Sequence, residues 1–306
     1  MDLYVAPLEG ITGYIFRNAY HDYFGAEAKK YYSPFLSLGT KIGIKEKERR
    51  DVLPANNQNY NLIPQVMTIS PEDFNKTKHI LRDFGYEEIN INFGCPARTV
   101  TSGGRGSGAL ANLSKLDQFL DEIFKDGDTN ISIKTRIGIK YTEEFASVME
   151  IYNKYPVKEL TIHPRLLKEQ YKGVPHHEIF LEALSIAKMP VCYNGDINTV
   201  EDYVNLMKLI GENSDKNISA VMIGRGVLKD PAIIRKISAY TENKGVGLEA
   251  SNEEVKAMLC RLQKDYAAIF SGQLPVLYKL KEIWCYLGQG LYAEQPKLIK
   301  KILKSK

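Results

Sequence analysis

Eight short apolar runs alternate with helix-like segments along the first 240 residues of this 306-residue chain. Each run is four to six residues long, which is typical of a strand, and most contain Val, Ile or Tyr. Their number, spacing and alternation with helices favour an α/β protein of the (β/α)8 or TIM-barrel type. The runs cover residues 3–6, 29–32, 62–66, 88–92, 130–135, 159–163, 191–194 and 220–223.

The segments between the runs carry helix-start signals. Ser70 is followed by proline and two acidic residues, and Asn112, Thr142 and Thr199 open three further amphipathic segments. An open doubly wound sheet is the competing architecture. It would carry a glycine-rich fingerprint after the first strand, whereas residues 5–10 read VAPLEG. This favours the barrel.

The pattern changes after about residue 240. Residues 242–247 are typical of a linker, and Ser251 with Glu254 forms a capping box before a helical stripe. Pro275 and Pro296 indicate two further helices, and no strand-like run occurs in this part. We therefore expect two domains, a barrel of residues 1–240 and a small all-helical domain of residues 241–306.

The net charge of +4 comes from the end of the chain. Residues 239–306 hold eleven Lys and Arg against seven Asp and Glu, while the first 238 residues hold equal numbers of both signs. A basic C-terminal helix is more often a solvated face than a binding surface, but it would suit a polyanion.

Composition excludes several classes of protein. No apolar run has transmembrane length and no leader signal opens the chain, so we expect a cytoplasmic protein that does not enter a membrane. Four cysteines lie far apart without a CxxC pair, which argues against a zinc site and against disulfides. We expect a monomer with no metal.

Polar residues stand at six of the predicted strand ends, where barrel enzymes carry their active sites. Each of them alone has an ordinary structural explanation, but six in the same position indicate one site. They are Gln65 at the end of the third run, Asn92 at the end of the fourth followed by Cys95, Lys134 and Arg136 at the fifth, His163 and Arg165 at the sixth, Asn194, Gly195 and Asp196 at the seventh, and Gly224, Arg225 and Gly226 at the eighth.

The last two strand ends predict a phosphate site. Barrels often hold phosphate after strands seven and eight, where glycines allow close approach of the backbone and Arg225 adds charge. Flavin mononucleotide (FMN) fits, because Lys134 would stabilise its anionic reduced ring. A sugar-phosphate substrate would use the same phosphate site. Cys95, in a glycine-rich loop, taken alone is more often a buried structural residue.

These residues resemble the motifs of the tRNA-dihydrouridine synthase family, FMN enzymes that reduce uridines in tRNA. The resemblance spans residues 3–237, and the order of its motifs is more specific than any one of them. The matching segments are Ala6 and Pro7 followed by residues 10–17, Gln65, NFGCP at 92–96, residues 106–110, KTRIG at 134–138, His163, residues 170–173, NGDI at 194–197 and MIGRG at 222–226.

The resemblance implies a role for each matched position. Cys95 would be the general acid that protonates C5 of uracil while hydride reaches C6 from reduced FMN, and NADPH would re-reduce the flavin. The target uridine would be flipped out of the stacked RNA, and the helical C-terminal domain would bind the tRNA. Ala6, Pro7, Gln65, Lys134 and His163 would hold the flavin ring; Asn194, Gly195, Asp196, Gly224 and Arg225 the ribityl phosphate; Asn92, Arg98, Arg136 and Tyr171 the substrate.

The chain departs from the family pattern in two places. Leu8 replaces the usual methionine, and the loop after the sixth run reads HPRL at 163–166 and VPHH at 174–177. The alternatives are an FMN barrel oxidoreductase of a small molecule, similar to dihydroorotate dehydrogenase, and a catalytically silent RNA-binding barrel. Retention of Cys95, Lys134 and His163 argues against the second alternative.

Overall fold

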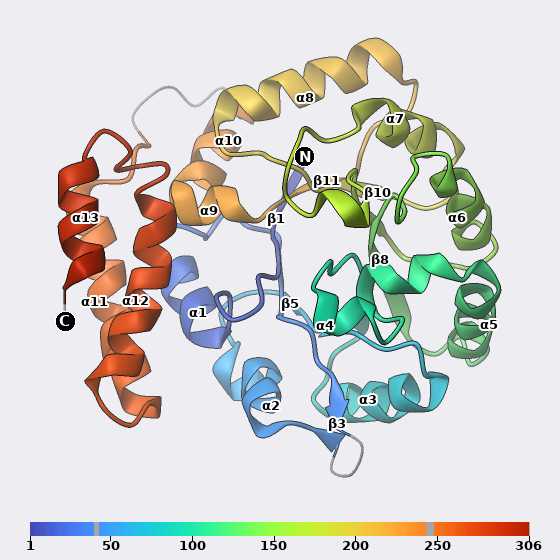
Figure 1. Ribbon diagram of the computed structural model, residues 1–306, viewed down its shortest axis with the longest axis horizontal. Coiled ribbons are helices and arrows are strands. Elements are labelled where there is room, and N and C mark those ends of the chain that lie inside the picture. The colour runs from blue at the N-terminus through green and yellow to red at the C-terminus, as the bar shows by residue number, and fades with distance from the viewer. Residues whose placement is uncertain (40–42, 243–247, 306) are drawn as a thin grey trace.

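The computed structural model describes residues 1–39, 43–242 and 248–305. Within these residues, nine parallel strands form one nearly closed barrel with helices around it (Figure 1). The TIM-barrel prediction is therefore confirmed. In barrel order the strands are β5 (Leu62–Ile63), β2 (Lys30–Tyr32), β1 (Asp2–Val5), β11 (Ala220–Ile223), β10 (Val191–Tyr193), β9 (Leu160–His163), β8 (Asn130–Arg136), β7 (Glu88–Phe93) and β6 (Gln65–Val66).

The predicted third strand is divided at Pro64, and its two halves close the barrel. β5 pairs with β2, whereas β6 pairs with β7. Proline has no N–H to donate, so the ladder breaks there, although the Pro64 carbonyl still accepts a hydrogen bond from the Asn90 N–H at 2.9 Å. The eight predicted runs thus occupy eight positions around the ring.

Seven helices of the described residues cover the outside of the barrel (Figure 1). The predicted N-caps Ser70, Asn112 and Thr199 each accept a backbone hydrogen bond. The predicted start at Thr142 is wrong, because the helix begins at Glu144, whose own carboxylate accepts the N–H groups of the preceding loop. These helices are α1 (Tyr14–Tyr23), α3 (Pro71–Asp83), α5 (Leu113–Phe124), α6 (Glu144–Tyr152), α7 (His177–Ile186), α8 (Val200–Asn213) and α10 (Ile233–Thr241).

Several short elements lie in segments for which the sequence predicts loops. Between β2 and β5 come a hairpin of β3 (Leu38–Gly39) and β4 (Gly43–Ile44), the helix α2 (Glu46–Val52) and a 3-10 turn, Pro54–Asn56. The glycine-rich segment contains the helical turn α4 (Arg98–Thr101) and the 3-10 turn Gly106–Ala111. A further short helix, α9 (Arg225–Lys229), follows β11.

Three C-terminal helices pack together beside α1 and α9, at the left of Figure 1. The capping box of Ser251 and Glu254 is present, and Trp284 packs against Tyr292 with ring centroids 5.5 Å apart. The middle helix begins before the predicted Pro275. The predicted linker lies mostly outside the described residues, and the domain boundary stays a prediction. The helices are α11 (Asn252–Ile269), α12 (Gln273–Leu287) and α13 (Pro296–Lys304).

Alternation along the strands separates two cores. Leu3 and Val5 belong to the large cluster between strands and helices, whereas Tyr4 and Ala6 belong to a small cluster inside the barrel. At the amino-terminal end of the barrel, Lys30 forms an ion network with Glu88 and Glu159. The opposite end is left open for polar side chains. No helix of the described residues is both long and apolar enough to cross a bilayer.

Candidate active site

A cleft at the carboxyl ends of the strands is lined by all but one of the residues to which the resemblance assigns a role. The exception is Arg98, which is exposed on α4 and does not line the cleft. The lining also includes residues that the sequence interpretation did not assign to the site, notably Leu8, Glu9, Phe35 and Asn198. The predicted residues brought together are Ala6, Pro7, Gln65, Asn92, Cys95, Lys134, Arg136, His163, Tyr171, Asn194, Gly195, Asp196, Gly224 and Arg225.

The Asn92 side chain fixes the backbone of the cysteine loop. Its Oδ1 accepts hydrogen bonds from the N–H groups of Gly94 at 2.9 Å and Cys95 at 2.8 Å. Because Oδ1 faces these donors, Nδ2 must face the other way, and it donates to Gln65 Oε1 at 2.7 Å. Gln65 Nε2 in turn donates to Asn90 Oδ1 at 2.7 Å. A directed chain of buried amides therefore holds the loop that carries Cys95.

Arg136 is fully buried and binds three backbone carbonyls. Its guanidinium donates to Gly94 O at 2.9 Å, to Leu166 O at 3.0 Å and to Gln170 O at 2.6 Å. It thereby ties the cysteine loop to the loop after β9. These contacts give Arg136 a positioning role, as the hydrogen bonds of the side-chain amide do for Asn92. The expected contacts of both residues with a uracil stay predictions.

The Cys95 thiol is half-buried at the cleft. Burial raises its pKa above the ordinary value for cysteine, and this outweighs the opposing effects of the Ala97 backbone N–H and the Arg136 charge. The thiol is therefore protonated at neutral pH. A protonated thiol in a cleft can donate a proton but is a poor nucleophile.

The Lys134 ammonium makes no hydrogen bond or ion pair with any described residue, although it lies in the cleft. Burial and the charge of Arg136 lower its pKa to about 8. A desolvated cation of this kind is unfavourable unless an acceptor or an anion binds it. Lys134 is thus the clearest sign that the cleft takes a ligand.

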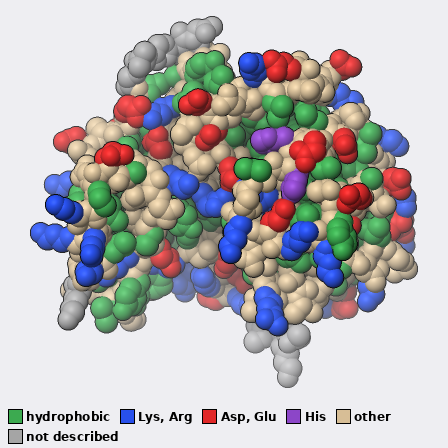
Figure 2. All heavy atoms as spheres, turned by 45° about the horizontal axis from the view of Figure 1, so that its top comes forward, with side chains coloured by type: hydrophobic (Ala, Val, Ile, Leu, Met, Phe, Trp, Pro, Cys, Tyr) green, Lys and Arg blue, Asp and Glu red, His purple; other side chains and the backbone are tan. Residues whose placement is uncertain are grey.

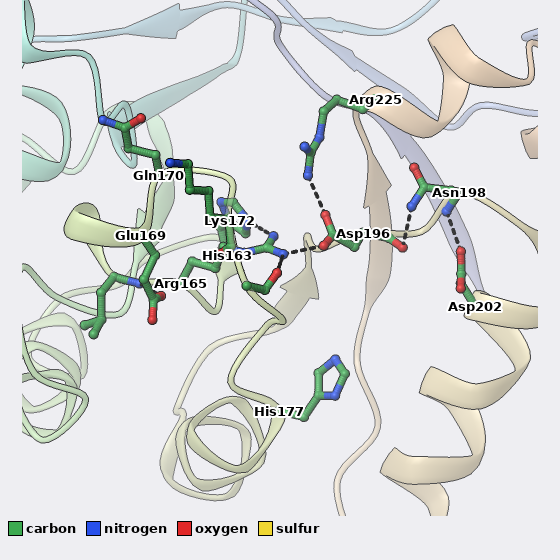
Figure 3. A network of polar contacts seen from close by, with 12 residues as sticks. His163, Arg165, Glu169, Gln170, Lys172, His177, Asp196, Asn198, Asp202 and Arg225 are labelled. Atoms are coloured by element: carbon green, nitrogen blue, oxygen red, sulfur yellow. Dashed lines mark hydrogen bonds and ion pairs between the residues drawn. The ribbon is translucent and has the colours of Figure 1, made fainter. Parts of the chain in front are cut away.

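A buried arginine, Arg165, connects two parts of the cleft (Figure 3). Its Nη1 donates to His163 Nε2 at 3.2 Å, and its Nη2 donates to the Asp196 carboxylate and to Gly173 O. Asp196 also binds Arg225 Nη2 at 2.5 Å. Burial opposes ionisation of Asp196, but the hydrogen bond and charge of Arg165, helped by Arg225, hold its pKa below the ordinary value.

The contact with Arg165 also defines the state of His163. Burial, reinforced by the charges of Arg136 and Lys134, lowers the pKa of His163 well below its ordinary value, so the ring is neutral. An arginine can only donate, so Nε2 must accept and the proton lies on Nδ1. His163 therefore offers one N–H donor.

The loops after β10 and β11 leave backbone donors unused. The N–H groups of Gly195 and Asp196 donate to no described residue, and those of Arg225 and Gly226 begin α9. A side chain at Gly226 would lie 2.1 Å from Ile197 O, so only glycine fits. Two arginines face one aspartate here, so the site can hold an anion such as a phosphate.

Tyr171 lies across this anion site. Its ring is half exposed and is flanked by the guanidinium groups of Arg225, 5.0 Å from the ring centroid, and Arg136, 5.3 Å away. Its centroid is 6.2 Å from that of His163.

The sequence alone marks Arg165 only as a strand-end residue, without a role in the site. Its spacing of two from His163 was the available signal, because alternation places both on one side of the chain.

A parallel barrel with a protonated thiol, an unpaired lysine and a cluster of arginines and backbone donors at its strand ends defines an α/β-barrel enzyme whose cleft can accept an anionic ligand. A model of the dihydrouridine synthase (Dus) family matches residues 4–285. The chain therefore belongs to the dihydrouridine synthase family.

Individual relatives agree with this assignment. The tRNA-dihydrouridine synthase B of Pasteurella multocida is 26% identical over 264 residues, which are 86% of this chain and 76% of that protein. The tRNA-dihydrouridine synthase B of Shewanella oneidensis is 27% identical over 290 residues, covering 94% and 86% of the two chains. A probable tRNA-dihydrouridine synthase of Staphylococcus epidermidis is 25% identical over 241 residues, covering 76% and 70%.

Proposed function

We propose that this protein reduces particular uridines of tRNA to 5,6-dihydrouridine in the cytoplasm, with bound FMN as cofactor and NADPH as reductant. Membership of the family and the names of the relatives support the reaction. The observation that carries the proposal is that one cleft contains both a protonated Cys95 thiol and a Lys134 ammonium without a partner among the described residues.

The cleft fits FMN on two independent features, the unpaired lysine and the unused backbone donors after β10 and β11. Lys134 would face the electron-rich edge of the ring, where a cation stabilises the reduced form. Ala6, Pro7, Gln65 and His163 would line the ring. Asn194, Gly195, Gly224 and Arg225 would bind the ribityl phosphate. Asp196 is an acceptor, so it would orient Arg165 and Arg225 rather than touch the phosphate.

When bound and reduced, FMN supplies the hydride for C6 of the uracil. The chain's own contribution is the proton for C5. Cys95 holds that proton on Sγ at neutral pH, and the resulting thiolate recovers a proton from solvent after each turnover. The amide chain from Gln65 through Asn92 fixes the position of the thiol.

The substrate has to reach this cleft as an extruded nucleotide, because the C5–C6 bond is covered in stacked RNA. Tyr171 and the exposed Arg98 would contact the nucleotide. Figure 2 shows Lys and Arg side chains over the C-terminal helices at the left of the view, and others where these helices meet the barrel. We assign the tRNA backbone to this surface.

The deciding experiment compares the dihydrouridine content of tRNA from cells with and without this protein, by mass spectrometry of nucleosides. We expect the signal to be lost at one or two uridine positions, which would also name the targets. An unchanged profile in cells that lack any second such enzyme would refute the proposal and favour a small-molecule substrate.

A further inference from the structure

A second cavity, of about 490 Å³, lies beside the active-site cleft. The two share Glu9 and Pro34 as a common wall, so their contents are neighbours. It is bounded by the loop before α1, by α2 and by the C-terminal end of α11. None of the residues assigned above to cofactor, catalysis or substrate lines it.

The walls of this second cavity are mainly aromatic and apolar. Tyr14 and Ile15 come from α1, while Tyr266, Ile269 and Phe270 come from the end of α11. The Tyr266 and Phe270 rings stack with centroids 5.8 Å apart and an interplanar angle of 17°. Aromatic walls favour a flat conjugated ring, and a cavity of this volume accommodates one nucleobase.

Charged side chains stand around this apolar interior. Arg50 pairs with Glu46 at 3.0 Å, and Lys279 donates to Gly10 O at 2.7 Å and to Glu282 at 2.8 Å. Lys47 makes no hydrogen bond or ion pair with the described residues. An apolar interior with three cations among its lining residues suits a base inside and phosphodiester groups outside.

Three acids line the same cavity, and none of them opposes this assignment. Glu46 is already paired with Arg50. The Asp51 carboxylate points into the protein, where its Oδ1 accepts the Tyr14 N–H at 2.8 Å. Glu9 stands between the two cavities, and its carboxylate forms no hydrogen bond with the described residues. An acceptor between two adjoining nucleotides can bind a ribose hydroxyl or a base N–H.

We propose that this cavity binds the base of a nucleotide adjacent to the target uridine. The inference rests on the proposed function, since it requires an extruded uridine in the neighbouring cleft. Extruding one base leaves its neighbour without a stacking partner, at a cost in stability. A slot that restacks the neighbour lowers this cost and makes recognition sensitive to the base beside the target.

The test is a two-by-two comparison of protein and RNA. The uridine that the wild type reduces is first located by mass spectrometry of ribonuclease fragments. Binding of the intact transcript, and of transcripts with an abasic nucleotide on either side of that uridine, is then measured for wild type and Phe270→Ala. Phe270→Leu keeps the apolar bulk without the ring, and Tyr240→Ala removes an exposed aromatic residue outside both cavities.

We expect Phe270→Ala to weaken binding of the intact transcript about 10-fold, as loss of one stacked base does. One abasic transcript should bind the wild type about 10-fold more weakly, and the two defects should not add when combined. Phe270→Leu should resemble Phe270→Ala, whereas Tyr240→Ala should bind like the wild type. Flavin content should be unchanged in all three variants.

Wild-type affinity in Phe270→Ala, or two defects that add in full, would overturn the inference. The inference would also be overturned if an apolar small molecule copurified tightly bound in this cavity and did not compete with RNA for binding. Failure of the proposed function itself would look different, because the wild type would then form no dihydrouridine in the intact transcript.

Discussion

Replacing Asn92 by alanine should release the cysteine loop and measurably destabilise the barrel. The substitution removes three hydrogen bonds, two from the N–H groups of Gly94 and Cys95 and one to Gln65 Oε1. At about 1 kcal/mol for each bond, the expected loss is about 3 kcal/mol. For a domain of this size, that lowers the midpoint of thermal unfolding by about 6 °C.

The measurement is thermal unfolding of the cofactor-free protein, followed by circular dichroism. Ser107→Ala is the matched comparison, because it removes one hydrogen bond to the Cys95 carbonyl while the Ser107 N–H still donates to the same oxygen. It should cost about 1 kcal/mol. If Asn92→Ala melts within 2 °C of the wild type, or no lower than Ser107→Ala, the amide chain does not hold this loop.

Four further outcomes are expected. Cys95→Ala should keep its flavin and lose about 10²–10⁴-fold in dihydrouridine formation, and wild-type rates would remove the thiol from the mechanism. Lys134 has a pKa of about 8 when folded and 10.5 when unfolded, so the unfolded chain binds more protons between these values. The stability of the cofactor-free wild type should therefore rise from pH 8 to 10 relative to Lys134→Met, and a constant difference in melting temperature would contradict this. Nitrogen NMR should find His163 as the Nδ1–H tautomer in the wild type and as a mixture of the Nδ1–H and Nε2–H tautomers in Arg165→Met. The same tautomer in both proteins would show that Arg165 does not determine where the His163 proton lies. Alanine at the four lysines of α13 should weaken tRNA binding and lower the slope of log affinity against log salt by up to about 3, whereas equal slopes would make α13 a solvated face. These lysines are Lys297, Lys300, Lys301 and Lys304.

The barrel could be predicted from the sequence because its strands are buried on both faces. Runs such as residues 220–223 are short, apolar and bounded by polar segments, and eight such runs in alternation with helices favour the barrel. The break at Pro64 was visible as a residue without an N–H. Which strand each half of the divided run pairs with depends on the order of the strands around the closed barrel, and the local sequence does not contain that order.

Many of the residues in the cleft were also predictable, because carboxyl strand ends meet at one face of a barrel. Ala6, Pro7 and Tyr171 were assigned only through the resemblance to the family. The direction of each side chain was not predictable. Asn92 and Arg136 stand where a substrate contact is expected, yet their hydrogen bonds go to other groups of the protein, chiefly backbone groups of the cysteine loop. Which acceptor a guanidinium reaches depends on loops far along the chain, such as residues 166–170.

The segment between β2 and β5 escaped prediction for a local reason. Residues 45–50 read KEKERR, a charge run without an apolar stripe, so the sequence gives no amphipathic signal for α2. Its helix is supported by Asp51, which accepts the Tyr14 N–H, and by Arg17, which binds the Asp51 carbonyl. Contacts of this kind between distant segments do not produce a periodic pattern in the sequence.

The position of Trp284 has a practical consequence for following how this protein unfolds. It is the only tryptophan of the chain, and it lies on α12 against Tyr292 rather than in the barrel. Tryptophan emission therefore reports the environment of the C-terminal helices, while bound flavin would report the barrel. Two coincident transitions in urea would mean one cooperative unit, whereas an earlier tryptophan transition would mean that residues 241–306 unfold as a separate domain.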